Sequence, residues 1–139
     1  MKETKKIKIK SSLGFTLVEL LVVVAIIGIL SAIGVVSYNG YVSSTKAKSA
    51  ENIMHQISLA QQEEYSSFGS YFSNSDICDQ STTEEIGTDL FGSAGYIDRD
   101  KIGYDFCALS SGSTFTIYAE SIAPGCKMEL DASGNFTNC

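Results

Sequence analysis

The first pattern along the chain is a long apolar run close to its N-terminus. From Leu20 to Val36 no residue is charged, and Ser31 is the one polar side chain. As a helix, residues 15–36 would be about 33 Å long at a rise of about 1.5 Å per residue, enough to cross the hydrocarbon core of a membrane. A helix is also how such a segment satisfies its backbone in lipid. The run therefore predicts a helix of membrane length.

Beyond the apolar run the pattern becomes amphipathic. Apolar side chains recur at helical spacing at Ile53, Ile57 and Ala60, with polar residues between them. No proline interrupts the segment, so we predict one helix over residues 15 to about 67, about 80 Å long. Its first half is too apolar to remain in water and needs a membrane or a bundle of similar helices.

The region 68–103 shows no sustained periodicity. It is rich in Ser, Gly, Asn and Asp, and its length exceeds that of ordinary loops, so we expect a structured connection or small elements. Its aromatic residues are expected to pack on the helix or on the sheet described next, and they are Tyr71, Phe72, Phe91 and Tyr96.

Alternating apolar and polar residues predict antiparallel strands at the end of the chain, residues 104–139. Phe115 and Ile117, for example, alternate with Thr116 and Tyr118. Turn-like runs separate the predicted strands, which cover residues 104–109, 113–122, 126–130 and 135–137. The expected fold class is α+β: a long N-terminal helix whose C-terminal half packs on a small antiparallel sheet.

Charge divides the chain into two parts. The basic residues Lys2, Lys5, Lys6, Lys8 and Lys10 precede the apolar run, whereas the whole chain has a formal net charge of −6. A basic stretch before an apolar run is typical of an export signal or signal anchor, with the lysines on the cytoplasmic side. An acidic body repels phosphates, so nucleic-acid binding is not indicated.

Glu19 is a carboxylate inside the segment of membrane length. Placed deep in a bilayer it would cost about 2–3 kcal/mol, so such a residue usually has a partner and a function. A carboxylate at the membrane edge that reaches water is the simpler alternative. An ordinary signal peptide cleaved near the small residues 31–34 would leave Glu19 without an explanation.

Residues 14–20, GFTLVEL, resemble the processing motif of type IV prepilins and of the related type II secretion pseudopilins. The resemblance implies that residues 1–14 are a leader and that a prepilin peptidase cleaves between Gly14 and Phe15. It further implies N-methylation of Phe15 and a role for Glu19 in assembly. Many type IV pilins carry a proline where Val36 stands here, so this chain departs from that pattern.

The resemblance implies a pilin fold and a structural subunit of a type IV pilus, most like a type IVa pilin. Residues 15–36 would form the transmembrane and filament-core half of the helix. Residues 37–139 would form a head with a helix at 37–67. The partners implied are further pilin subunits, the prepilin peptidase and an inner-membrane platform protein. The precursor would cross the inner membrane once, and the product would be an extracellular pilus.

Two alternatives remain open. A type II secretion or competence pseudopilin would share the motif and form a periplasmic filament. A signal-anchored periplasmic binding module that never polymerises would explain the apolar segment but not the GFTLVE motif. An enzyme is not expected, because the chain has a lone histidine, His55, and no nucleophile motif.

Cys78, Cys107, Cys126 and Cys139 follow the export-type N-terminus and predict two disulfides in an oxidising compartment. Three connectivities are possible. Cys126–Cys139 is favoured because the two residues bracket a hairpin-like segment, and type IV pilins often carry such a C-terminal pair. Cys78–Cys107 then joins the connecting region to the first strand.

No metal or cofactor is expected. The cysteines form no CxxC pair for zinc, and the three acidic residues near the first strand lack the form of a calcium loop. These residues, Asp98, Asp100 and Asp105, are expected to be solvated loop charges.

Overall fold

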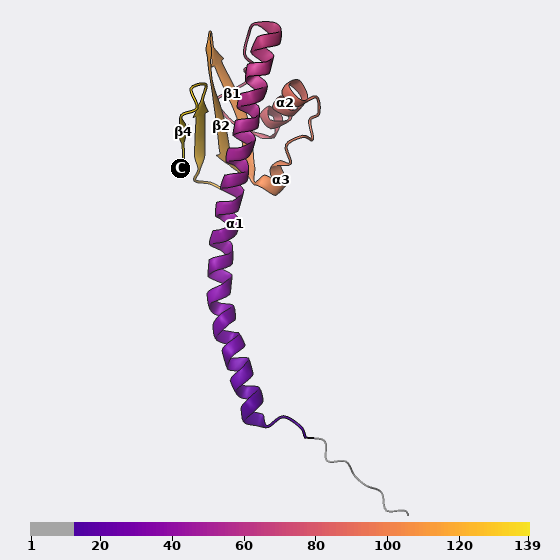
Figure 1. The fold of residues 1–139 in the computed structure, drawn as a ribbon, viewed down its shortest axis with the longest axis vertical. Coiled ribbons are helices and arrows are strands. Elements are labelled where there is room, and N and C mark those ends of the chain that lie inside the picture. The colour runs from indigo at the N-terminus through magenta and orange to yellow at the C-terminus, as the bar shows by residue number, and fades with distance from the viewer. Residues whose placement is uncertain (1–12) are drawn as a thin grey trace, which may run out of the picture. The chain divides into compact units, whose positions relative to one another are not determined.

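The computed structural model describes residues 13–139, so the predicted leader lies outside the described residues except for its last two positions. Three helices come first: α1 (Leu17–Phe68), α2 (Gln80–Phe91) and α3 (Arg99–Ile102). Four strands follow: β1 (Tyr104–Ser111), β2 (Thr114–Ser121), β3 (Lys127–Asp131) and β4 (Phe136–Thr137) (Figure 1). This arrangement confirms the predicted α+β class. The chain divides into two compact units, one that ends at Gly40 and one over Tyr41–Cys139.

In the first unit α1 is apolar and uncovered. By length and composition this helix can cross a membrane, and none of its most apolar stretch is buried. Leucine, isoleucine and valine side chains from Leu17 to Val36 are exposed on every side of the helix. Such a surface is stable only against lipid or against other apolar helices.

In the second unit one face of α1 enters the core. Ala50, Met54, Ile57 and Gln61 are its buried residues, at intervals of three and four that place them on one side of a helix. The three apolar ones belong to one cluster with buried side chains of the sheet, among them Phe106, Phe115, Ile117 and Leu130. The predicted packing of the second half of the helix on the sheet is therefore present.

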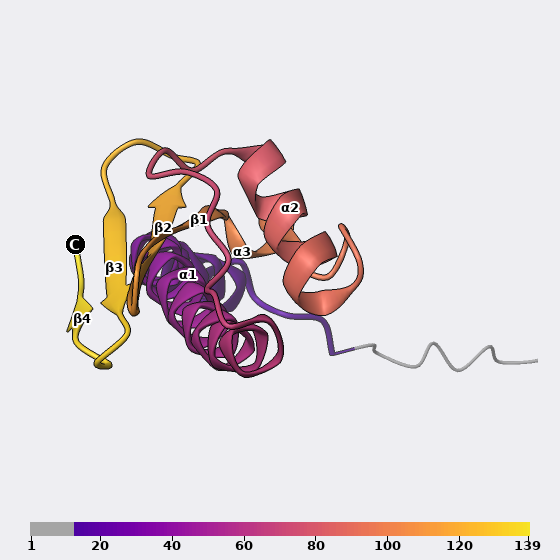
Figure 2. The ribbon, with the colours of Figure 1, turned by 90° about the horizontal axis from the view of Figure 1, so that it is seen from above.

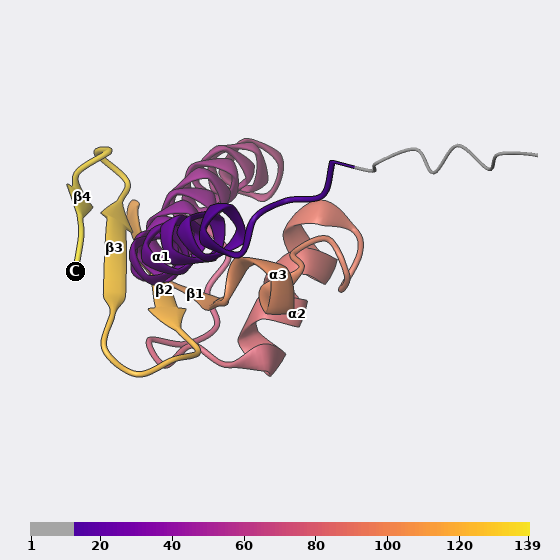
Figure 3. The same cartoon turned by 90° about the horizontal axis from the view of Figure 1, so that it is seen from below.

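The sheet is an antiparallel meander in the order β1-β2-β3-β4. Ala108 lies opposite Ile117, and Ile117 lies opposite Leu130, so apolar residues of neighbouring strands share one face. Seen from above and from below, α2 and α3 lie on the β1 side of this unit, and β4 forms the far edge (Figures 2 and 3). The strand bounds agree with the sequence prediction to within two residues.

The connection between α1 and the sheet contains two helices. Asp79 caps α2 by accepting a hydrogen bond from the Thr82 N–H, and the Thr82 hydroxyl accepts one from the Asp79 N–H. Gly92 ends α2 with a φ of 75°, a conformation that glycine adopts without strain. The sequence indicated only small elements here, because an Asp-x-x-Thr box is a weaker signal than the usual Ser/Thr-x-x-Glu.

Buried polar side chains hold this connection in place. The Gln61 Nε2 donates to the Phe72 carbonyl oxygen at 2.8 Å, and the Phe72 N–H donates to Gln61 Oε1 at 2.8 Å. Thr83 Oγ1 accepts from the Phe106 N–H at 2.8 Å and thereby joins α2 to β1. As expected, aromatic residues of the connection pack against the core, namely Tyr71, Phe72 and Phe91. Tyr96 instead stays about half exposed and stacks on Phe91.

The expectation that Asp105 is a solvated loop charge is wrong. Asp105 lies in β1 and is 7% exposed. Arg99 donates to both of its carboxylate oxygens, with Nε–Oδ1 at 2.6 Å and Nη2–Oδ2 at 2.8 Å. The hydrogen bond to Asp105 is the main reason that the pKa of Arg99 is raised. Asp98 and Asp100 are exposed, as expected.

Candidate processing and assembly site

The candidate cleavage bond lies in a non-helical segment just before α1. Residues 13–16 have no regular structure, and α1 begins at Leu17. A Cβ added at Gly14 would meet nothing within 4 Å, and Phe15 is 89% exposed. A peptidase could therefore bind the Gly14–Phe15 bond without first unwinding a helix.

Thr16 and Glu19 form a capping box at the first turn of α1. The Thr16 N–H donates to Glu19 Oε2 at 2.7 Å, and the Thr16 hydroxyl donates to the same oxygen at 2.8 Å. The Thr16 hydroxyl also accepts from the Glu19 N–H at 3.2 Å. From the sequence, Thr16 was predicted only as part of the processing motif and not as a helix cap. The signal was present, because Thr-x-x-Glu before an apolar run is the pattern of a capping box.

Among residues 13–139, both donors to the Glu19 carboxylate come from Thr16. This satisfies part of the hydrogen-bonding capacity of a carboxylate whose neighbours on the helix are apolar. The carboxylate stays on the outside of the helix, since Glu19 is exposed. It is therefore held in a defined orientation while remaining available to a second charged group.

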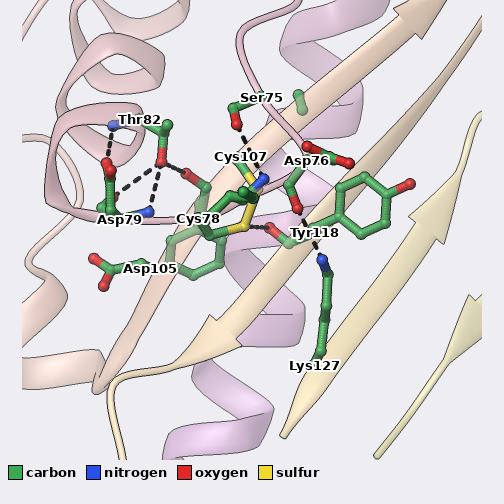
Figure 4. Close-up of a disulfide and its surroundings, with 12 residues drawn as sticks. Ser75, Asp76, Cys78, Asp79, Thr82, Asp105, Cys107, Tyr118 and Lys127 are labelled. Carbon is green, nitrogen blue, oxygen red and sulfur yellow. Dashed lines mark hydrogen bonds between the residues drawn. A yellow bond between two sulfur atoms is a disulfide. The ribbon is translucent and has the colours of Figure 1, made fainter.

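Two disulfides lie in the second unit, away from this site in the sequence. Cys78, in the loop before α2, is joined to Cys107 in β1, and both residues are buried (Figure 4). The Cys78 sulfur lies 3.6 Å from the carbonyl oxygen of Tyr118. Beside it, the Lys127 ammonium donates to the Asp76 carbonyl oxygen at 2.8 Å. These contacts attach the connection to the middle of the sheet.

The second disulfide joins Cys126, before β3, to Cys139 at the end of the chain. Between them, Asp131 organises the turn from β3 to β4: its carboxylate accepts from the N–H groups of Ser133 and Asn135, both at 2.9 Å. The Asn135 side-chain amide also donates to Asp131 at 2.8 Å, and this is the first cause of the lowered pKa of Asp131. Both pairings agree with those favoured from the sequence, and they remain predictions for peptide mapping.

Metal ligands do not gather in the part of the chain that the structure describes. Residues 13–139 contain no group of three or more His, Cys, Asp or Glu side chains placed to hold a metal ion.

Residues 9–35 match the family model of the prokaryotic N-terminal methylation motif. The chain has the N-terminus of a prepilin of the type IV pilin and pseudopilin kind. The match includes the Gly14–Phe15 bond, the Thr16–Glu19 box and the first turns of α1. The family is one of structural subunits. No curated protein and no solved structure shows significant similarity to the chain.

Proposed function

We propose that the chain is the precursor of a structural subunit of a type IV pilus. A prepilin peptidase removes residues 1–14, Phe15 is N-methylated, and the subunits polymerise through the N-terminal part of α1. The methylation-motif match over residues 9–35 is the observation that carries this proposal. The exposed Gly14–Phe15 bond and the oriented Glu19 carboxylate support it.

Cleavage would supply a cationic partner for the Glu19 carboxylate. Hydrolysis of the Gly14–Phe15 bond creates an α-ammonium on Phe15, one residue before the Thr16 N–H that already contacts the carboxylate. Placing a carboxylate in an apolar surrounding costs much less free energy when a cationic group is paired with it. If the ammonium belongs to a neighbouring subunit, the pair also sets the register between the two helices.

The exposed apolar half-helix gives the subunit two states. Before assembly, residues 15–36 cross the inner membrane once, with lipid against their side chains. In the filament the same side chains pack against those of other copies, while residues 37–139 form the head. An inner-membrane platform protein would transfer subunits from the first state to the second, and the product would be an extracellular pilus.

A pseudopilin of a type II secretion or competence system is the second candidate, because the matched motif is shared by both groups. Such a subunit would undergo the same cleavage and form a periplasmic filament. The C-terminal Cys126–Cys139 pair favours the pilus, since type IV pilins often carry it. A binding module that never polymerises would have no use for the methylation motif.

Two measurements test the proposal. Mass spectrometry of mature material should find an N-terminus at Phe15 carrying one methyl group. Electron microscopy should show surface filaments that are absent from a deletion strain and present again when the gene is reintroduced. A mature N-terminus beyond Ala32, or a functional form with an uncut leader, would contradict the proposal that the chain is a prepilin. Filaments confined to the periplasm would favour the pseudopilin.

A further inference from the structure

A groove on the second unit lies between α1 and the end of α2. It has a volume of about 240 Å³, and α1 lines it with Gln56, Leu59, Ala60 and Glu63. Phe91 and Tyr96 line the other side. Leu59 is 67% exposed and Tyr96 is 48% exposed, so the groove presents apolar surface to its surroundings.

The aromatic wall of the groove is held in place before any partner binds. The rings of Phe91 and Tyr96 stack with centroids 4.1 Å apart and an interplanar angle of 5°. The Tyr96 hydroxyl donates to Gln56 Oε1 on α1 at 3.0 Å, which joins the two sides. A preformed surface loses little conformational entropy on binding.

Glu63 is the one charged residue among those that line the groove. Within residues 13–139, no basic group forms an ion pair with the Glu63 carboxylate. The groove therefore combines apolar walls with one carboxylate that has no cationic partner in the described chain, a combination that fits a cationic side chain with an apolar stem.

Basic side chains are few in the second unit, and most of them are already engaged. Arg99 binds Asp105, Lys127 donates to a carbonyl oxygen and covers the Tyr118 ring, and Lys48 pairs with Glu51. Lys101 is different, because its side chain is 85% exposed and its contact is an exposed one with Asp98 at 3.5 Å. Lys46 forms no ion pair in the described chain, but its side chain is only partly exposed. Lys101 therefore combines high exposure with a weak exposed contact.

Glu63 and Lys101 lie at opposite ends of the second unit. Figure 1 shows α3, which carries Lys101, at the end of this unit opposite the C-terminus of α1. Lys46 lies beside α3, because a Cβ on Gly103 would come within 3.2 Å of its side chain. Lys46 and Glu63 are separated along α1 by about 25 Å at about 1.5 Å per residue. Glu63 cannot reach the α3 end of its own chain.

We propose that the Glu63 groove receives the α3 end of a second copy of this chain, with Lys101 of that copy paired to Glu63. This inference rests on the proposed function, which requires contacts between copies. A contact between two different surfaces of the same molecule repeats along a filament wherever its rotation does not close a ring. The Glu63 carboxylate complements the Lys101 ammonium, while the neighbouring carboxylates of Asp98 and Asp100 contact Lys101 and Arg99 of their own copy. The apolar walls of the groove cover the lysine stem.

Chemical crosslinking tests this contact directly. Filaments assembled from a mixture of isotopically light and heavy full-length subunits are treated with a zero-length carbodiimide, which joins a carboxylate to an amine. We expect a mixed-label peptide pair linked between Glu63 and Lys101, absent from filaments of the Glu63→Gln variant. Filaments that yield other mixed-label pairs but never this one would overturn the proposal.

Charge reversal gives an independent measurement. Glu63→Lys and Lys101→Glu should each lower the ratio of filament to membrane-held subunit by roughly fivefold, the scale of one exposed ion pair. The double variant should restore most of the wild-type ratio. Glu129→Lys, an equal charge change at an exposed position on β3, is the matched control and should leave the ratio unchanged.

These outcomes separate the two proposals. If the wild-type chain forms no filament, the proposed function fails. If the wild-type chain does form filaments, two results would refute the Glu63–Lys101 contact and leave the proposed function standing. One is a wild-type ratio of filament to membrane-held subunit in either single variant. The other is a ratio in the double variant that is no higher than in the single variants. An equal decrease of the ratio in Glu129→Lys would show an effect of net charge and would also overturn the contact. A different protein bound in the groove in purified filaments would overturn it as well.

Discussion

Thr16 donates two hydrogen bonds to the Glu19 carboxylate before any second chain is present. Its N–H and its hydroxyl donate to one oxygen of Glu19, in the same turn that begins α1. The residue proposed to act in assembly is therefore also a helix cap in the precursor. Loss of Glu19 and loss of Thr16 should consequently have different effects, which makes the pair a useful test.

Glu19→Ala should leave export and cleavage largely intact and stop assembly, because the new α-ammonium of Phe15 then has no carboxylate to pair with. Thr16→Val keeps the carboxylate and removes only the hydroxyl bonds, at a cost of about 1 kcal/mol of helix stability. It should assemble at a reduced yield. The yield of sheared filaments, measured against the membrane pool, compares the two. Normal assembly of Glu19→Ala would refute the charge-pairing account.

Gly14→Arg should block maturation, because the peptidase must accommodate a residue without a side chain at the cleavage bond. The uncut precursor should accumulate in the membrane, where its larger mass is visible by mass spectrometry. Gly28→Ala is the matched control: Gly28 lies inside α1 with nothing within 4 Å of an added Cβ, so this variant should be cleaved normally. Efficient cleavage of Gly14→Arg would show that the bond is elsewhere.

The two disulfides should contribute unequally to stability. In the chain-entropy relation, the separations of 29 and 13 residues correspond to about 3.6 and about 2.9 kcal/mol. Replacing both members of the Cys78–Cys107 pair with alanine should also disturb the core, since Cys107 is fully buried.

Mild reductant followed by alkylation should label the exposed Cys139 first. Earlier labelling of Cys107 would contradict this order.

Arg99→Ala should destabilise the second unit by about 2–3 kcal/mol, because it leaves the buried Asp105 carboxylate without its cation. This figure lies below that of a fully buried pair since the Arg99 side chain is partly exposed. Lys101→Ala, two residues away and exposed, should change the free energy of unfolding by less than about 0.5 kcal/mol. Chemical unfolding of the full chain in detergent measures both. Equal effects would mean that the ion pair adds no stability.

Asp131 should make the β3–β4 turn sensitive to acid. Hydrogen bonds from Asn135, and further ones from the turn backbone, lower its pKa from the ordinary value of 3.8. A lowered pKa in the folded state stabilises the turn above pH 3.8, and the contribution is lost as pH falls below 3.8 through the folded value. Asn135→Ala should move the pKa of Asp131 back toward 3.8 in a carboxyl NMR titration. An unchanged titration would show that these bonds do not form in solution.

The sequence by itself determined the long helix, the strands of the sheet and the candidate processing site. Each depends on residues near one another in the chain. The apolar run and the spacing of Ile53 and Ile57 specify α1 through the helical period, and Phe115 and Ile117 specify β2 through alternation. The GFTLVEL motif is contiguous, so it could be recognised without a fold, and Thr16–Glu19 was readable as a capping box.

Only the tertiary structure decided which polar residues are buried. Gln61 and Asp105 look like surface residues in the sequence, yet both are buried. Their partners, Phe72 and Arg99, lie 11 and 6 residues away and reach them only after the connection folds back on α1 and β1. The Glu63 groove has the same origin, since α1 and the end of α2 approach each other only in the folded chain. Burial depends on such approaches, which local periodicity does not encode.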